Sequence, residues 1–118
     1  MQVRFTTPLR VTETGDGTTW RLTGPMLVEY GNKVMAVPAG FETDFASIPR
    51  VFRSLVPILG RQNKPSVWHD YLYVEKPVSR RDADWLFLEA LESVGVGWLK
   101  RNAMWAAVRV GGSRVWQT

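Results

Sequence analysis

Cysteine is absent from the 118-residue sequence, and histidine occurs once, at position 69. The lack of cysteine excludes disulfides, thiolate metal sites and cysteine nucleophiles. Hydrolytic zinc sites commonly use two or three histidines, so a single imidazole is a poor basis for one. We therefore expect no resident metal and no cofactor, and any mechanism that needs an imidazole must use His69.

Long apolar runs are also missing. None approaches the roughly 20 residues of a membrane-spanning helix, and residues 1–5 lack the apolar segment of a secretory signal. We expect no membrane insertion and a protein that stays in the cytosol where it is made. Residues 15–17 (GDG) are not followed by the lysine of a phosphate-binding loop, which disfavours nucleotide chemistry.

Acidic residues are outnumbered, because 15 Lys and Arg residues stand against 11 Asp and Glu and give a net charge of +4. Such a balance points to nucleic acid when the cations form a stripe or belong to a recognisable binding module. Here the arginines are scattered, and only Arg80 and Arg81 form a dense spot. The sequence therefore disfavours a nucleic-acid partner.

Hydrophobic residues at 45% and charged residues at 22% are typical of a globular protein. The length predicts a single domain over residues 1–118. Its β-rich part covers residues 1–46, where Thr, Val, Tyr and Trp alternate with Gly-containing turns. We expect strands at 3–13, 18–23, 26–30 and 33–37, with the last two joined by Gly31 and Asn32 in a tight hairpin. Residues 38–40 (PAG) should end the sheet.

Residues 47–112 have the spacing of helices, and a short tail is expected at 113–118. Ser79 should cap a helix with Asp82 in its first turn. A second helix is expected at 98–110, ending before two glycines, with a shorter helix at 65–75 and a weaker one at 49–59. The core stripe of the first helix recurs at helical spacing: Ala83, Leu86, Phe87, Ala90, Leu91 and Val94. The fold class is α+β, an N-terminal antiparallel β-meander followed by about three helices packed on it.

Some large apolar residues fall outside the expected core stripes. Trp85 and Leu88 lie opposite the stripe of their helix, where a solvated helix carries charge. The 98–110 helix is apolar nearly all round, with one stripe (Leu99, Ala103, Ala106, Val110) and further apolar residues beside it (Met104, Trp105, Val108). We expect another subunit to cover this surplus, with an interface formed by Trp85, Leu88, Trp105 and Trp116.

Two polar segments, 40–50 and 68–73, lie in apolar surroundings. Ser47, His69 and either Asp44 or Asp70 have the residue types of a catalytic triad, although no nucleophile elbow surrounds the serine. The sequence does not exclude an oxygen-rich magnesium or calcium site that uses Asp44, Asp70 and Asp84. The interpretation we favour is structural, with His69 in a buried polar network that ties Asp44 to Asp70.

Three motifs carry a family resemblance: the run at 37–50 (VPAGFETDFASIPR), the run at 69–73 (HDYLY), and 79–84 (SRRDAD) with Phe87. In this order, over residues 26–112, they resemble the phage and prophage family called domain of unknown function 1353. The resemblance implies a tailed-phage origin, in genomes where such genes lie among tail, baseplate or lysis genes, and no established activity. Its shared polar positions correspond to Thr43, Asp44, Ser47, Pro49, His69, Asp70, Tyr73, Arg80 and Asp84.

Three functions remain as hypotheses. The first is a virion component of the tail or baseplate, or an accessory to its assembly, which contacts other phage proteins or copies of itself. It would be found in the bacterial host cytoplasm during assembly and then in the virion. The second is a hydrolase of the host envelope in which Asp44, His69 and Asp70 act as acid and base or as metal ligands. The third is a small effector that binds a host protein or nucleic acid.

Overall fold

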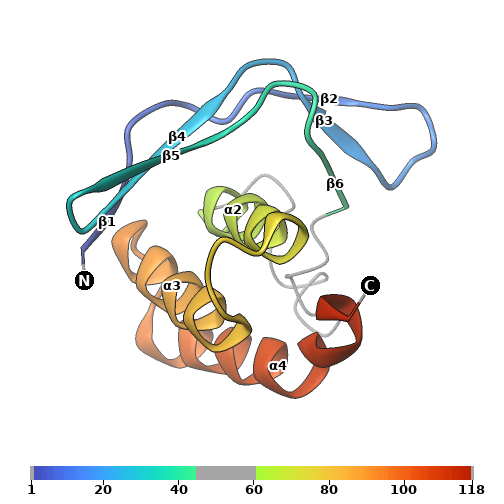
Figure 1. The fold of residues 1–118 in the computed structure, drawn as a ribbon. Coiled ribbons are helices and arrows are strands. Elements are labelled where there is room, and N and C mark those ends of the chain that lie inside the picture. Colours follow the sequence, from blue (N-terminus) through green and yellow to red (C-terminus); the bar gives the residue numbers. More distant parts are fainter. Residues whose placement is uncertain (1, 45–60, 118) are drawn as a thin grey trace.

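Two small antiparallel sheets and three helices make up residues 2–44 and 61–117, the part of the chain that the computed structural model describes. The strands form an arched layer, and helix α2 lies between that layer and helices α3 and α4 (Figure 1). All of the strands precede the described helices, so the predicted α+β class is confirmed.

Each sheet has three strands. The first has the order β1-β4-β5 and the second the order β2-β3-β6. The strands of the first sheet are β1 (Val3–Phe5), β4 (Met26–Tyr30) and β5 (Lys33–Val37). Those of the second are β2 (Val11–Glu13), β3 (Trp20–Leu22) and β6 (Glu42–Thr43).

The β4–β5 hairpin has the predicted bounds. Gly31 occupies its turn with φ 60°, a conformation that glycine adopts without steric cost. Along β4, Met26, Val28 and Tyr30 are buried and alternate with more exposed residues. This period of two places one face of the sheet against the helices.

Two strand predictions are wrong. The expected strand at 3–13 divides into β1, which pairs with β4, and β2, which pairs with β3. Pro8 lies in the break and has no N–H to donate to a ladder. The sheet also does not end at Gly40, because a turn there (φ 90°) returns the chain to β3, where Thr43 pairs with Trp20.

Helix α2 (Asn63–Glu75) begins two residues before the predicted start. Pro65 fits in its first turn, where a missing N–H costs little. The helix ends at Glu75 and is capped by Lys76, which has φ 52° and donates its N–H to the Leu72 carbonyl. The weaker helix expected at 49–59 lies outside the described residues.

Helix α3 (Arg80–Ser93) matches the sequence prediction closely. The Ser79 side chain accepts a hydrogen bond from the Asp82 N–H at 3.1 Å, as expected of an N-cap. Five of the six predicted core residues are buried, and Val94 is partly buried. Phe87 and Leu91 are among the largest fully buried side chains.

Helix α4 (Trp98–Trp116) differs from the prediction in its length and in its buried face. It continues through Gly111 and Gly112 instead of ending before them. Met104 and Val108 face the protein interior, whereas Leu99 is 77% and Val110 is 84% exposed. The stripe that contains Leu99 and Val110 therefore faces outward. The sequence could not reveal this, because a helix that is apolar nearly all round gives no periodic signal of its buried side.

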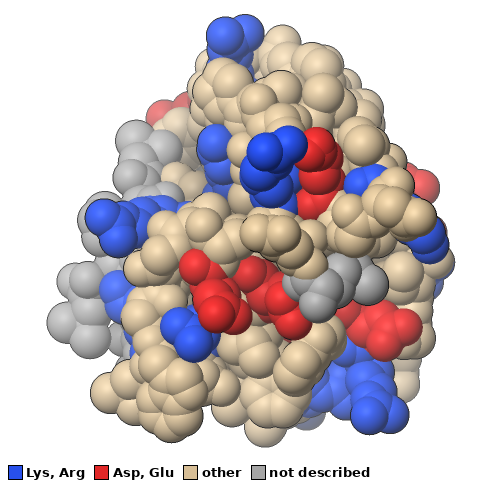
Figure 2. Space-filling view, turned by 90° about the vertical axis from the view of Figure 1, so that its left-hand side faces the viewer, with Lys and Arg blue, Asp and Glu red and all other residues tan. Residues whose placement is uncertain are grey.

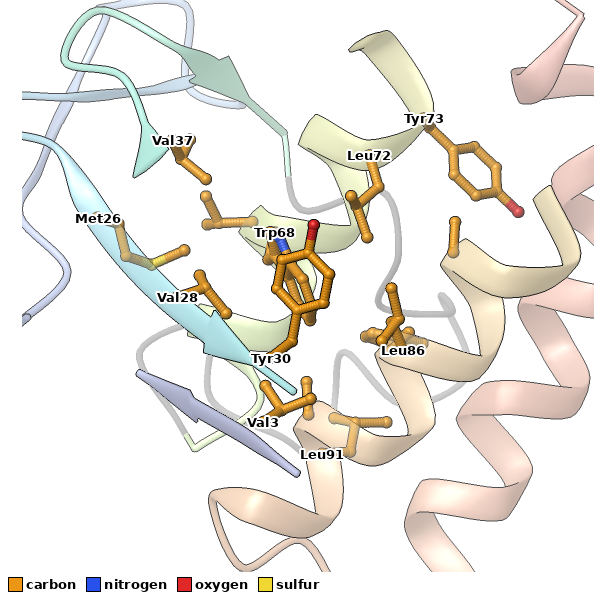
Figure 3. Packing of buried hydrophobic residues seen from close by; sticks show 14 of the residues in the cluster. Val3, Met26, Val28, Tyr30, Val37, Trp68, Leu72, Tyr73, Leu86 and Leu91 are labelled. Carbon is orange, nitrogen blue, oxygen red and sulfur yellow. The ribbon is translucent and has the colours of Figure 1, made fainter. Parts of the chain in front are cut away.

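The core lies between the first sheet and helices α2 and α3 (Figure 3). Trp68 is fully buried at its centre, with its ring centroid 5.5 Å from that of Tyr30 and 6.2 Å from that of Phe5. Its indole Nε1 donates to the Met35 sulfur at 3.3 Å. Trp68 thus binds α2 to three strands, and this fixes the helix that carries His69, Asp70 and Tyr73.

Candidate functional site

A buried carboxylate organises the polar residues of the helical layer. Asp84 on α3 is fully buried, and its Oδ1 accepts hydrogen bonds from the Tyr73 hydroxyl at 2.6 Å and from His69 Nε2 at 2.7 Å. Its Oδ2 accepts from Arg109 at 2.7 Å and lies 3.5 Å from an Arg80 nitrogen. We call these five residues the Asp84 cluster.

Three helices contribute to the cluster. His69 and Tyr73, four positions apart on α2, share one helix face. Arg80 and Asp84 have the same spacing on α3. The Arg80 guanidinium also donates to the carbonyl oxygens of Val108 and Arg109, both at 3.4 Å. The cluster therefore joins α2, α3 and α4 through one carboxylate.

The neighbours of Asp84 hold it in the charged state. Burial alone would raise the pKa of Asp84, but hydrogen bonds from His69, Tyr73 and Arg109 outweigh it and lower the pKa below its ordinary value. For Tyr73, burial and then the hydrogen bond to Asp84 raise the pKa well above that of a free tyrosine. The cluster thus contains a carboxylate and a neutral phenol over the physiological pH range.

His69 is sealed inside the protein, with 2% of its surface exposed. Its ring packs against Tyr73 and Phe87, with centroids 4.3 Å and 4.6 Å away. His69 lies in a buried polar cluster in which its Nε2 bonds Asp84, a residue that the sequence analysis did not pair with it. Sequence spacing could not identify this partner, because Asp84 lies on a different helix.

A second group of polar residues surrounds an open hollow at the β6–α2 margin. Asp70 on α2 accepts a hydrogen bond from the Thr43 hydroxyl on β6. Asp44 follows directly after that strand. We call this cavity, of about 590 Å³, the acidic hollow; its lining is Thr19, Phe41, Glu42, Thr43, Asp44, Asp70, Tyr73, Val74, Lys76 and Val115.

The acidic hollow brings carboxylates from separate elements to one concave surface. Asp44 and Asp70 belong to different segments, and such convergence is what acid–base chemistry requires. His69 is not among the residues that line it. No group of three or more histidine and acidic side chains among residues 2–44 and 61–117 is arranged to hold a metal ion.

A third feature lies between α3 and α4. Trp85, 51% exposed, and the partly buried Trp105 border a hollow of about 770 Å³. Arg81 and Arg109 supply positive charge at its edge, with Ser79 and Asp82 beside them. We call this cavity the tryptophan hollow. It combines indole surface with guanidinium groups, the residue types that dominate the energetics of protein interfaces.

The other residues expected at an interface are less exposed. Leu88 is partly buried on α3. Trp116 is also partly buried, because its ring packs edge-on against Tyr73 with centroids 5.1 Å apart. The Lys76 ammonium lies 5.2 Å from the centroid of the same indole. Trp116 thus anchors the end of α4 to α2.

The predicted site residues therefore separate into two groups. His69, Tyr73, Arg80 and Asp84 belong to the buried cluster, whereas Thr43, Asp44 and Asp70 line the acidic hollow. Ser47 and Pro49 lie outside the described residues. Sequence reasoning missed Arg109, although a cation between two valines at the end of the apolar run 103–108 was a signal for a buried partner.

The surface gives no sign of a continuous basic band on the face seen in Figure 2, where Lys and Arg side chains lie among Asp and Glu side chains. Such mixed charge provides little long-range attraction for a phosphate backbone. In the described part of the chain, no helix combines the length and the apolar character needed to cross a bilayer.

Comparison with known proteins identifies a family. The family model described as a protein of unknown function (DUF1353) matches residues 20–108. This match covers most of the sequence, so the chain belongs to that family. No curated protein and no solved structure matches it.

Proposed function

We propose that this member of the DUF1353 family is a tailed-phage virion component of the tail or baseplate, or an accessory to its assembly, and that it acts through protein–protein contacts. It would assemble in the bacterial host cytoplasm and then remain in the virion. The partners would be other phage proteins or copies of the chain itself. The proposal rests on the apolar surface of the α3–α4 layer.

That surface is the observation that carries the proposal. Exposed large hydrophobic side chains concentrate on these two helices, where Trp85, Trp98, Leu99, Val110 and Val115 are each more than half exposed. Large apolar side chains left in water have a free-energy cost, so their concentration on these two helices supports an interaction site there.

The tryptophan hollow makes this surface suitable for specific contacts. An indole that is half exposed can insert into a partner, and the Arg81 and Arg109 guanidinium groups can hydrogen-bond carbonyl or carboxylate oxygens around it. Arg109 is already held by Asp84 at 2.7 Å, so it would enter a complex with little loss of side-chain freedom.

The sealed histidine supports the same conclusion from another direction. The only imidazole of the sequence bonds Asp84 in the interior, where 2% of the His69 surface is exposed. The polar residues around it join three helices. We infer that this cluster is a scaffold that fixes α3 and α4 relative to α2.

The test is complementation of a phage whose copy of this gene has been deleted. Electron microscopy of lysates should show incomplete particles, and mass spectrometry should find the wild-type chain in purified virions or assembly intermediates. The Trp85→Ala variant should fail to restore infectivity, because loss of an interface tryptophan costs about 2 kcal/mol or more, roughly thirtyfold in affinity.

Val34→Ser is the matched control, since Val34 is also exposed but lies on β5, away from α3 and α4. It should complement fully, and both variants should unfold near the wild-type urea concentration. Complete virions without this gene, or full complementation by Trp85→Ala, would contradict the proposal.

A second candidate function is a hydrolase that acts on the host envelope, and the acidic hollow favours it. Asp44 and Asp70 line one cavity with the Thr43 hydroxyl nearby, so one carboxyl group could act as acid and the other as base. His69, the third predicted catalytic residue, faces Asp84 and would act only by positioning α2.

Purified peptidoglycan is the probe for this candidate. Release of new reducing ends or amino groups should be lost in Asp44→Asn and in Asp70→Asn, and should be retained in Trp85→Ala. A wild-type chain that releases neither product at any pH between 4 and 9 would exclude peptidoglycan hydrolysis.

A further inference from the structure

The outward face of α4 carries a regular apolar line. Leu99, Ala103, Ala106 and Val110 follow one another at spacings of four, three and four, which place them on one side of a helix. Leu99 and Val110 are largely exposed, whereas Met104 on the opposite side is fully buried. We call the four residues the α4 seam.

The shape of the seam suits another helix. Its length, at about 1.5 Å per residue, is roughly 17 Å, or about three helical turns. Alanines occupy its centre and larger side chains its two ends. Small central residues allow a second helix axis to approach to about 8 Å, while Leu99 and Val110 supply apolar contacts at the ends.

The charge beside the seam selects the occupant. Helix α4 contains Lys100, Arg101, Arg109 and Arg114 and no Asp or Glu. Lys100 and Arg114 are exposed, at opposite ends of the seam. A second copy packed on this face would bring like charges together, which opposes pairing.

We propose that the α4 seam is the docking surface for an amphipathic α-helix of a partner protein, with apolar residues at its seam positions and Asp or Glu on its flanks. The inference rests on the proposed function and adds the chemistry of the partner. Apolar contacts supply affinity, and the acidic flanks meet Lys100 and Arg114 and fix the orientation.

Two designed peptides test it. Both are labelled helices of about three heptads with leucine at positions a and d; one has glutamate at e and g, the other lysine. Fluorescence anisotropy with the full chain should give a Kd at least about tenfold lower for the glutamate peptide, because only this peptide pairs with the cations of α4.

Variants locate the binding surface. The double variant Leu99→Ser and Val110→Ser should weaken binding of the glutamate peptide about tenfold or more, and Lys100→Glu with Arg114→Glu should reverse the preference between peptides. Val34→Ser should bind like the wild type. Equal binding of both peptides, binding of neither, or binding that the seam variants leave unchanged would overturn the inference.

Other occupants give different results. A wild-type dimer in sedimentation analysis that the Leu99→Ser, Val110→Ser variant dissociates would assign the seam to a second copy. Seam-dependent binding to vesicles of phosphatidylcholine and phosphatidylglycerol, without a preference between peptides, would assign it to a lipid surface. Either result overturns the inference.

The outcomes also separate this inference from the proposed function. If neither peptide binds but Trp85→Ala still blocks particle assembly, the inference is wrong and the virion role stands. If the glutamate peptide binds as expected but gene deletion leaves virions intact, the virion role is wrong and the seam serves another partner.

Discussion

His69 and Asp70 are neighbours in the sequence and belong to different parts of the molecule. His69 enters the Asp84 cluster, where almost none of its surface is exposed. Asp70 is partly buried and borders the acidic hollow, where Thr43 donates to it. One position along α2 therefore separates a sealed region from an open one.

The difference follows from helix geometry. Successive residues in an α-helix are rotated by about 100°, so His69 and Asp70 leave α2 in different directions. Tyr73, four positions after His69, connects the two regions, because it lines the acidic hollow and its hydroxyl reaches Asp84. Polar residues that are adjacent in a sequence thus need not belong to one site.

The largest expected difference between the two regions is in stability. Asp84→Asn leaves His69 and two arginines without their carboxylate, and should lower the free energy of unfolding by about 3 kcal/mol. Asp70→Asn retains an acceptor for Thr43 and should cost about 1 kcal/mol or less. Urea unfolding at pH 7 measures both.

The cost of Asp84→Asn should also depend on pH. Because the folded-state pKa of Asp84 lies below the unfolded value of 3.8, its stabilisation is complete above that pH and is lost as the pH falls through the folded pKa. The difference in unfolding free energy between wild type and Asp84→Asn should therefore decrease below about pH 4. Equal costs for Asp84→Asn and Asp70→Asn would remove the distinction between a sealed and an open region.

Tyr73→Phe tests the residue that connects them. The change keeps the ring but removes a hydrogen bond to a charged acceptor, at a cost of about 2 kcal/mol. Since folding raises the pKa of Tyr73 above its ordinary 10.0, this stabilisation is present below pH 10 and is lost as the pH rises further. The difference in unfolding free energy between wild type and Tyr73→Phe should shrink between pH 10 and 12; a constant difference would show that the phenol is not tied to Asp84.

Two adjacent glycines provide a matched test of packing around the sealed region. A Cβ at Gly112 would overlap the Tyr73 hydroxyl and crowd Arg80, whereas a Cβ at Gly111 would meet open space. Gly112→Ala should cost about 1–2 kcal/mol. Gly111→Ala should stabilise the helix by up to about 1 kcal/mol. Thermal unfolding distinguishes the signs, and stabilisation by both changes would mean that α4 does not approach Tyr73 this closely.

The smallest effect is expected at the exposed apolar surface. Leu99→Ala should change the free energy of unfolding by no more than about 0.5 kcal/mol, because the side chain is largely in solvent. A loss above about 1 kcal/mol in urea unfolding would show that the chain itself covers this position.

The sequence predicted some elements well. Helix α3 has a capping serine and a single apolar stripe, so its bounds and its buried face follow from periodicity. The β4–β5 hairpin has alternating burial and a glycine turn, and its bounds are as predicted. In both elements, the capping or turn residues and the apolar pattern predict the same structure.

Other features depend on contacts between distant residues. Helix α4 is apolar on most sides, so the sequence did not reveal that Met104 faces inward and Leu99 outward, nor that the helix passes through Gly111. The partner of His69 lies 15 positions away on another helix. Helix spacing predicts which residues share a face, but not which faces meet.

The close approach at Gly112 has a consequence for the evolution of this family. One missing methyl group allows α4 to pass the phenol of Tyr73, so the two positions should vary together among relatives. Sequences with alanine or serine at the position of Gly112 should have phenylalanine or a smaller residue at that of Tyr73. They would also have to satisfy the buried carboxylate by another route, such as an ordered water molecule. An alignment of relatives that freely combines tyrosine at the first position with larger side chains at the second would show that the helices can move apart.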